Sequence, residues 1–406
     1  MMLLSILFLI VLEITLYYLI KYLKCDFQWL ITNHDEKISF DKDDINKFYI
    51  NSYHKELGWD RRSNTSKQEL IKGHGEYKIN PSKSQYSMNN DNSRSNTLHE
   101  KYQKKIITFG DSYTFCRHVN DDQTWQWHLS KLLKANVVNH GVGNYGIDQS
   151  VQKFHLEIDK YQSEAEIIIL GGVPESIMRI NSMWKHYSEY GNIFGFKGRY
   201  ILKDDKLVWI DNIISDISIL SSIDKYYDEI KKYDLCYEHK FKKDKIEFPY
   251  IYHLLRTSKR NIPLLFHLVV RKLALKYAIK NEKLINRAYD HIMRFNHLFT
   301  ISLYKDPKHL HLFKRIITNF TENVEKLNMK PIYLFIPYLH DLIYFRKNNI
   351  YYNTFISDLK KHMTVIDMTN EFMNYQIEDL YVSKSYGSHV SSLGNQIIAK
   401  YIKKSI

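Results

Sequence analysis

The sequence predicts an α/β fold in which a parallel β-sheet is flanked by helices and preceded by one apolar N-terminal helix. Short apolar runs of strand length alternate with helical stretches of about a dozen residues, a pattern typical of a parallel sheet covered on both faces. The pattern is interrupted by a long basic helical stretch and then resumes near the C-terminus. With 406 residues, of which 44% are hydrophobic, the chain can bury a sizeable core.

Residues 1–24 are predicted to form a transmembrane anchor. The run MMLLSILFLIVLEITLYYLIKYL is interrupted only by Glu13 and is long enough to span a bilayer. It lacks a basic flank before the apolar run and a small-residue cleavage site, which favours a single-pass anchor over a cleaved signal peptide. A buried or interfacial helix stays open as the alternative, because a carboxylate in mid-membrane is costly unless it is protonated or paired.

The elements after the anchor follow in order. Residues 25–104 are a polar N-terminal extension, and within it residues 80–100, rich in Asn, Ser and Asp, are predicted to be an extended and poorly ordered connector. Strands are predicted at residues 105–109, 136–139, 165–171, 331–337 and 364–368. Helices are predicted at residues 123–134 and 149–160 and from about Leu393 to the C-terminus.

Residues 215–325 are predicted to be a helical insertion between the two parts of the α/β domain, residues 105–214 and 326–406. Within it, residues 262–280 are amphipathic and basic, which is compatible with a membrane surface. The alternative is a helix that packs its apolar face on the core. Residues 193–210 resemble a hairpin that turns at residues 203–205 and could cover the site.

The formal net charge of +13 is spread over the chain. The sequence has no helix-turn-helix, zinc-finger or RNA-recognition signature, so we expect no nucleic-acid partner and favour anionic lipid or an acidic glycan. Three cysteines, Cys25, Cys116 and Cys236, make no disulfide framework, and no Cys/His spacing resembles a zinc site. We therefore predict no metal or organic cofactor.

The first predicted strand of the sheet ends in Gly110-Asp111-Ser112. Open α/β folds place their sites at the carboxyl ends of strands, and the backbone N–H of Ser112 could face a developing oxyanion there. A serine hydroxyl needs a base to take its proton, and His389, just before the last helix, is the candidate. The alternative is an ordinary strand–turn–helix connection with a capping serine and a loop histidine.

Together with further blocks in the same order, these motifs resemble the SGNH/GDSL hydrolase family, and in particular its membrane-anchored bacterial members. The further blocks are Leu57-Gly-Trp59, Val119-Asn-Asp-Asp-Gln-Thr-Trp125, Val137-Val-Asn-His-Gly-Val-Gly-Asn-Tyr-Gly-Ile-Asp-Gln149 and Ile167-Ile-Ile-Leu-Gly-Gly-Val-Pro-Glu-Ser176. The resemblance covers most of residues 55–210 and 330–406. It implies a flavodoxin-like SGNH fold with Ser112 as nucleophile and His389 as base.

The sequence departs from the family pattern at the catalytic acid. The family's acid stands three residues before the base, where this chain has Tyr386. Without an acid to orient the imidazole, a Ser–His dyad must serve, or a carboxylate from elsewhere. The carboxylates that could replace it are Asp148, Glu175, Glu378 and Asp379.

The predicted oxyanion hole also departs from the pattern. Asn144 replaces the family's glycine and can still supply its backbone N–H. Glu175 aligns with the family's oxyanion asparagine, and an ionised Glu175 would repel an oxyanion. It could instead be protonated, hold His389 or bind a cationic group of the substrate. We interpret Asp111 and Cys116, which replaces another family glycine, as structural residues.

The resemblance implies a serine hydrolase that acts on ester bonds, with an acyl ester or O-acetyl group of an envelope glycan or lipid as substrate and acyl-Ser112 as intermediate. The same chemistry with a sugar hydroxyl as acceptor would make an O-acyltransferase. The rival, favoured by Tyr386 and Glu175, is a non-catalytic, membrane-tethered module that binds or assembles polysaccharide. The resemblance places the domain on the outer, extracytoplasmic side, whereas Lys21 and Lys24 would favour the cytoplasm by the positive-inside rule.

Overall fold

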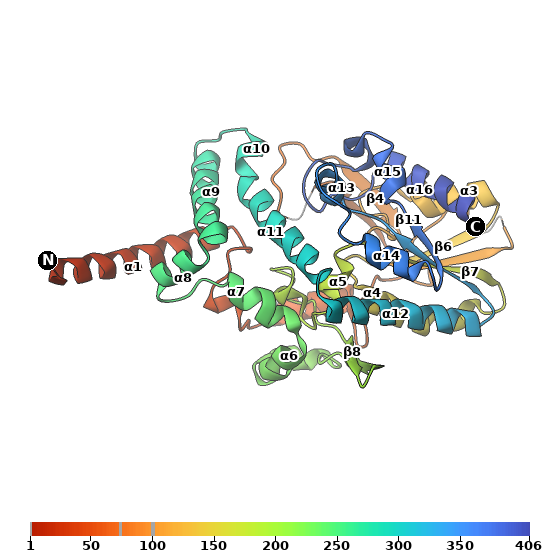
Figure 1. Ribbon diagram of the computed structural model, residues 1–406, viewed down its shortest axis with the longest axis horizontal. Helices are drawn as coiled ribbons and strands as arrows, with labels where there is room; N and C mark the ends of the chain where they lie inside the picture. Colours follow the sequence, from red (N-terminus) through yellow and green to blue (C-terminus); the bar gives the residue numbers. More distant parts are fainter. Residues whose placement is uncertain (1, 73–74, 99–101) are drawn as a thin grey trace.

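A five-stranded parallel sheet forms the centre of the computed structural model, which describes residues 2–72, 75–98 and 102–406 (Figure 1). The strands lie in the order β11-β10-β7-β5-β6, which is the flavodoxin-like order. Their bounds are β5 (Lys105–Gly110), β6 (Asn136–Gly141), β7 (Ala165–Gly172), β10 (Lys330–Phe335) and β11 (Thr364–Asp367). The predicted fold class is therefore confirmed.

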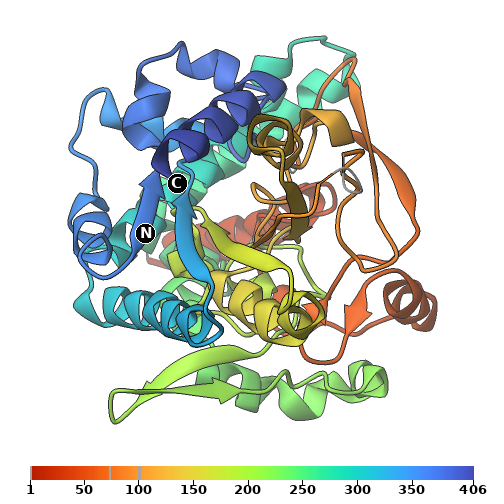
Figure 2. The ribbon, with the colours of Figure 1, turned by 90° about the vertical axis from the view of Figure 1, so that its right-hand side faces the viewer.

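Helices cover both faces of this sheet (Figure 2). On one face α3 (Trp125–Leu133) packs against α16 (Ser392–Ser405), and on the other α4 (Ile147–Glu157) packs against α12 (Pro307–Lys326). Helix α12 buries residues spaced three or four apart, such as Phe313, Ile316 and Phe320, which is the stripe expected of a helix on a sheet. The helical stretch predicted as an insertion thus ends in the helix that leads into β10.

Smaller elements surround this core. The helices are α2 (Lys42–Asn51), α5 (Ser176–Arg179), α6 (Tyr227–Tyr233), α7 (Lys242–Asp244), α8 (Tyr250–Arg256), α9 (Ser258–Lys276), α10 (Glu282–Ile285), α11 (Arg287–Leu303), α13 (Leu339–Phe345), α14 (Asn353–Leu359) and α15 (Thr369–Met373). The strands outside the central sheet are β1 (Tyr53–His54), β2 (Gly58–Trp59), β3 (Ser66–Leu70), β4 (Lys83–Ser87), β8 (Arg199–Lys203) and β9 (Lys206–Ile210).

The polar stretch before the first core strand is folded, so the prediction of a poorly ordered connector is wrong for residues 80–98; residues 99 and 100 lie outside the described residues. Strand β4 pairs with β3, and Arg94 is buried. The Arg94 guanidinium donates to the backbone carbonyls of Phe115, Cys116 and Val119 and pairs with Asp121. The sequence hides this order because charge-assisted hydrogen bonds, not apolar periodicity, fix the segment.

The predicted hairpin is confirmed as β8 and β9. The two residues at its tip, Asp204 and Asp205, have positive φ angles of 49° and 60°, as a two-residue hairpin turn requires. Its role as a cover for the site is a wrong expectation, because no residue of either strand lines the pocket described below. The hairpin packs against α12 and α4 instead.

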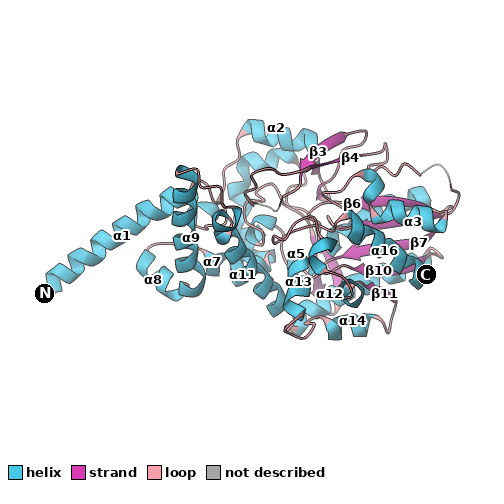
Figure 3. Cartoon of the chain, turned by 90° about the horizontal axis from the view of Figure 1, so that it is seen from above, coloured by secondary structure: helices cyan, strands magenta, loops and turns pink. Residues whose placement is uncertain are grey.

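Helix α1 (Met2–Lys24) projects from the body of the protein (Figures 1 and 3). It is the one helix of the described residues long and apolar enough to span a membrane, a test that a signal sequence also passes. The carboxylate of Glu13 accepts the backbone N–H groups of Tyr250 and Ile251 at 2.7 and 3.0 Å. The carboxylate that the sequence places in mid-helix is therefore paired with the N-terminus of α8.

Candidate active site

Ser112 lies in a tight loop at the carboxyl end of β5. A side chain at Gly110 would meet the Thr114 Oγ1 atom at 2.0 Å, so the loop can fold back on the strand only with glycine there. The carboxylate of Asp111 accepts the N–H of Tyr113 at 2.8 Å, and the Asp111 carbonyl accepts the N–H of Phe115. Asp111 thus holds the turn that presents Ser112, and burial raises its pKa to about 6.

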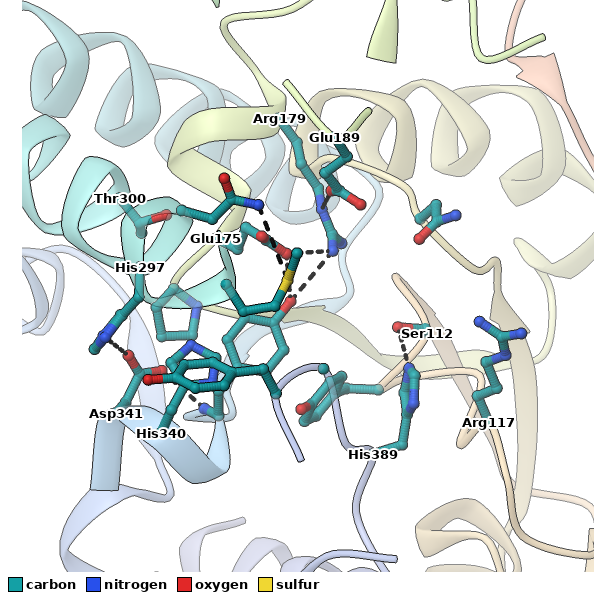
Figure 4. A pocket seen from close by; sticks show the side chains of 18 of the residues that line it. Ser112, Arg117, Glu175, Arg179, Glu189, His297, Thr300, His340, Asp341 and His389 are labelled. Carbon is teal, nitrogen blue, oxygen red and sulfur yellow. Dashed lines mark hydrogen bonds and ion pairs between the residues drawn. The ribbon is translucent and has the colours of Figure 1, made fainter. Parts of the chain in front are cut away.

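His389 lies directly beside Ser112, with its Nε2 atom 2.9 Å from the serine Oγ (Figure 4). It comes from the loop before α16. The Tyr113 hydroxyl donates to the carbonyl of Ser388 at 2.5 Å and ties this loop to the serine loop. The structure therefore brings together two residues that are 277 positions apart.

The Nδ1 atom of His389 is buried and has no hydrogen-bond partner among the described residues. Burial lowers the pKa of His389 well below its usual value, and the nearby His118, Arg117 and Arg179 lower it further. The imidazole is consequently neutral. Its protonated form, which a base must become, has no carboxylate to stabilise it.

None of the four carboxylates considered as substitutes hydrogen-bonds to His389. Glu175 pairs with Arg179. Asp148 forms a buried ion pair with Lys197, and Glu378 pairs with Arg346 at the surface. Asp379 does not line the pocket. The ring of Tyr386, at the family's acid position, lies against His340 with centroids 4.7 Å apart. Among the described residues, Ser112 and His389 are therefore a hydrogen-bonded pair without a carboxylate on His389.

Two residues that line the pocket, Ser112 and Asn144, have backbone N–H groups without a hydrogen-bond acceptor within the described ranges. Asn144 has a φ of 71°, a left-handed conformation that asparagine tolerates better than most residues. The loop after β6 can therefore keep the turn without the family's glycine.

Glu175 lies in the same pocket but supplies no donor. Its carboxylate accepts Nη2 of Arg179 at 2.7 Å and the hydroxyl of Tyr338 at 2.8 Å. Arg179 also donates to Glu189 and to the carbonyl of Tyr145. Burial raises the pKa of Glu175. The third oxyanion position of the family is thus occupied by an ion-pair network (Figure 4).

The structure adds residues that sequence reasoning missed. Arg179 stands four residues after Glu175, a spacing that pairs opposite charges on a helix and could have been read as a signal. His118 follows the serine loop, and its ring centroid lies 4.8 Å from that of His389. Tyr338 lies in the loop after β10 and belongs to no motif, so the sequence does not identify it as a pocket residue.

The end of the pocket opposite Ser112 holds a second histidine, which has a carboxylate partner. His297 on α11 contacts Asp341 on α13, with Nε2 2.8 Å from Oδ1 (Figure 4). Ligand atoms of His297, His340 and Asp341 lie within 4.8 Å of one another, a donor set that could hold a divalent cation. Asp341 already accepts the Tyr351 hydroxyl and the N–H of Tyr338, however, so these contacts account for its burial without a metal.

Comparison with known proteins assigns no activity to this chain. No protein-family model and no curated protein matches the sequence. Among solved structures, one similar chain belongs to a protein of Desulfitobacterium hafniense DCB-2 assigned to the G-D-S-L lipolytic family. The similarity has a TM-score of 0.35 and 13% identity, and it covers 75% of this chain and 99% of the other.

Proposed function

We propose that this protein is a serine enzyme that moves an acyl group through an ester on Ser112. The observation that carries the proposal is the 2.9 Å contact between His389 Nε2 and Ser112 Oγ beside two unpaired N–H groups. In the first step Oγ attacks the acyl carbonyl and Nε2 takes the serine proton. The oxyanion lies between the N–H groups of Ser112 and Asn144, and His389 then returns the proton to the leaving alcohol.

In the second half of the reaction a hydroxyl attacks the acyl-serine. Water would make the protein an esterase, and a sugar hydroxyl would make it an O-acyltransferase. Removing the acid of a catalytic triad costs on the order of 10⁴-fold in turnover, so we expect a slow enzyme or one whose substrate completes the site.

The proposed substrate is an acylated glycan or lipid of the cell envelope. The family resemblance supports this, and so does the helix α1, which would anchor the domain at a membrane as a single-pass segment. We propose that the domain lies on the outer side on the ground of the family resemblance alone, since α1 does not fix the orientation.

A second candidate is a membrane-tethered module that binds polysaccharide without catalysis. The unpartnered Nδ1 of His389 and the occupied position of Glu175 favour it, because both weaken acyl chemistry. The pocket would then serve as the sugar site.

Fluorophosphonate labelling of the full chain in detergent separates the two candidates, because the reagent modifies only an activated serine. We expect labelling of the parent protein and none of Ser112→Ala. A matched control is Ser302→Ala, which removes an exposed hydroxyl and should label like the parent. Absence of labelling in a folded parent protein would refute the proposed enzyme and favour the binding module.

If the serine is labelled, acylated glycans can be tested as donors with and without a sugar acceptor. Release of free acid in water would indicate hydrolysis, and transfer to the sugar would indicate an acyltransferase.

A further inference from the structure

Helix α1 is fastened to α8 and α9 along its C-terminal half. The Glu13 carboxylate caps the N-terminus of α8, as described above. Near the end of α1, the Lys272 ammonium of α9 lies 4.0 Å from the centroid of the Tyr22 ring and pairs with Asp26 at 2.6 Å. Because the contacts extend from residue 13 to residue 26, the three helices form one unit (Figures 1 and 3). Helix α1 is therefore packed on the domain and is not a separate, loosely attached anchor.

Large apolar side chains on and beside α8 and α9 are exposed. Phe248, Leu255, Phe266 and Tyr277 are each 62–69% exposed, although such side chains are normally buried. Further exposed apolar residues of this segment are Tyr252, Ile262, Leu273, Leu275 and Ile279. We call these nine residues the α8–α9 face. Soluble monomers rarely expose many large apolar side chains on one segment unless something covers them.

The segment that carries the α8–α9 face is basic, and Asp26, Glu247 and Glu282 are the acidic residues beside it that the sequence and the Lys272 ion pair identify. Residues 248–281 contain seven Lys and Arg residues and no Asp or Glu. The cations Arg256, Lys259, Lys276 and Lys280 are exposed. Aromatic and aliphatic side chains mixed with cations are characteristic of helices that lie in the interface of an anionic bilayer.

The length of α1 places this face at membrane depth. A helix rises about 1.5 Å per residue, so residues 2–12 cover roughly 16 Å, about half of a hydrocarbon core of about 30 Å. A complete crossing needs about twenty residues and would extend to about Tyr22. Helices α8 and α9 pack beside residues 13–22, and therefore any bilayer that α1 crosses must reach them.

We propose that the α8–α9 face is a second membrane-contacting surface that takes phospholipids with acidic headgroups. Its apolar side chains enter the acyl boundary beside α1, and its Lys and Arg side chains extend to the headgroups. Glu13 can then lie at bilayer depth because the N-terminus of α8 satisfies it. The proposal depends on α1 crossing the membrane and not on catalysis at Ser112.

The test places fluorophores on the face in the full chain. In a Cys25→Ser background, which leaves the buried Cys116 and Cys236 in place, Leu255→Cys and Phe266→Cys are labelled with an environment-sensitive dye. Met373→Cys on α15, an exposed apolar residue elsewhere on the body, is the matched control. The proteins are reconstituted into vesicles of phosphatidylcholine and phosphatidylglycerol.

We expect brominated lipid to quench the dye at positions 255 and 266 and to leave position 373 unquenched. Brominated phosphatidylglycerol should quench more than brominated phosphatidylcholine at the same mole fraction. Quenching of positions 255 and 266 by aqueous iodide, to the level of position 373, would overturn the proposal. If neither iodide nor either brominated lipid quenched the dye at positions 255 and 266, the proposal would also be overturned, since a second copy of the chain or another protein would then cover the face.

Discussion

His389 and His297 line the same pocket, and each lacks a different member of a Ser–His–Asp arrangement. His389 contacts the Ser112 hydroxyl but has no carboxylate, whereas His297 contacts the Asp341 carboxylate, and no serine hydrogen-bonds to it in the described part of the chain. A His–Asp contact in a pocket is thus no evidence of catalysis by itself. The two ends of the pocket differ in that His389 contacts a serine hydroxyl, beside backbone N–H groups that have no acceptor among the described residues.

The largest effect should come from removing the two histidines in turn. His389→Ala should lower the rate of fluorophosphonate labelling about 10²–10⁴-fold, because general-base assistance is lost. His297→Ala should change it only severalfold, and Tm should report folding of both variants. Equal decreases in labelling rate in the two variants would contradict this distinction and would indicate that His297 takes part in the reaction.

The Glu175 network gives the next largest effect. Glu175→Gln should lower the free energy of unfolding by about 2–3 kcal/mol, because the buried Arg179 loses one of its charged partners while Glu189 remains. Denaturant titration measures the change. Glu378→Gln, which removes an exposed partner of Arg346, should cost less than about 1 kcal/mol.

A stable Glu175→Gln variant with faster labelling would mean that Glu175 obstructs the oxyanion position. A stable variant with much slower labelling would mean that the carboxylate takes part in the reaction.

Because His389 is neutral in the native protein, the stability of the fold should decrease at acidic pH. Burial lowers the pKa of His389 and also those of His118, His140 and His186, the last three to about 3 or 4. Below pH about 6.5 the unfolded chain protonates these groups and the native protein does not. Stability should therefore fall between pH 6.5 and 4, by up to about 1.4 kcal/mol per pH unit for each histidine.

Asp111 acts in the opposite direction. Its pKa is raised to about 6, so its contribution to stability is present at low pH and is lost as the pH rises through 6. Asp290, whose pKa burial also raises to about 6, acts in the same direction as Asp111. The four histidines outweigh these two carboxyls, and thermal unfolding against pH measures the balance. A Tm that stays constant from pH 7 to 4 would contradict the neutral assignment.

The smallest predicted effect restores the family's acid. Tyr386→Asp places a carboxylate three residues before His389, and an acid that accepts the Nδ1 proton should speed labelling about tenfold, or 1.4 kcal/mol of barrier. Tyr386→Asn is the control because it removes the same ring without adding charge. Identical rates for the two variants would indicate that the new carboxylate does not reach Nδ1.

The sheet could be predicted from the sequence because its strands are continuous apolar runs. The predicted ends of β5, β6 and β7 are one or two residues short: Gly141 pairs with Gly110, so β6 continues past Asn139 through residues without apolar character. Strands β10 and β11 instead end before the predicted residues 337 and 368. Ser112 and His389 were found by motif. Arg94 and the network around Arg179 were not, because long-range polar contacts leave no periodic trace in a sequence.

The same limit applies to Glu13. In the sequence it is an isolated defect in an apolar helix, and its partner is the backbone of a helix 237 residues away. No property of either segment alone predicts that contact.

The short path from α1 to the core determines where the Ser112 pocket can lie relative to a membrane. Phe27, Leu30 and Ile31 are buried in the core within a few residues of the helix end. A second cavity, lined in part by Lys24 and Gln28, shares Trp29 and Lys72 with the Ser112 pocket. Because no long flexible linker separates α1 from the core, the Ser112 pocket would stay at a fixed height and tilt above any bilayer that α1 crosses. If the proposed acyl chemistry occurs there, it would reach only groups that are presented at that height.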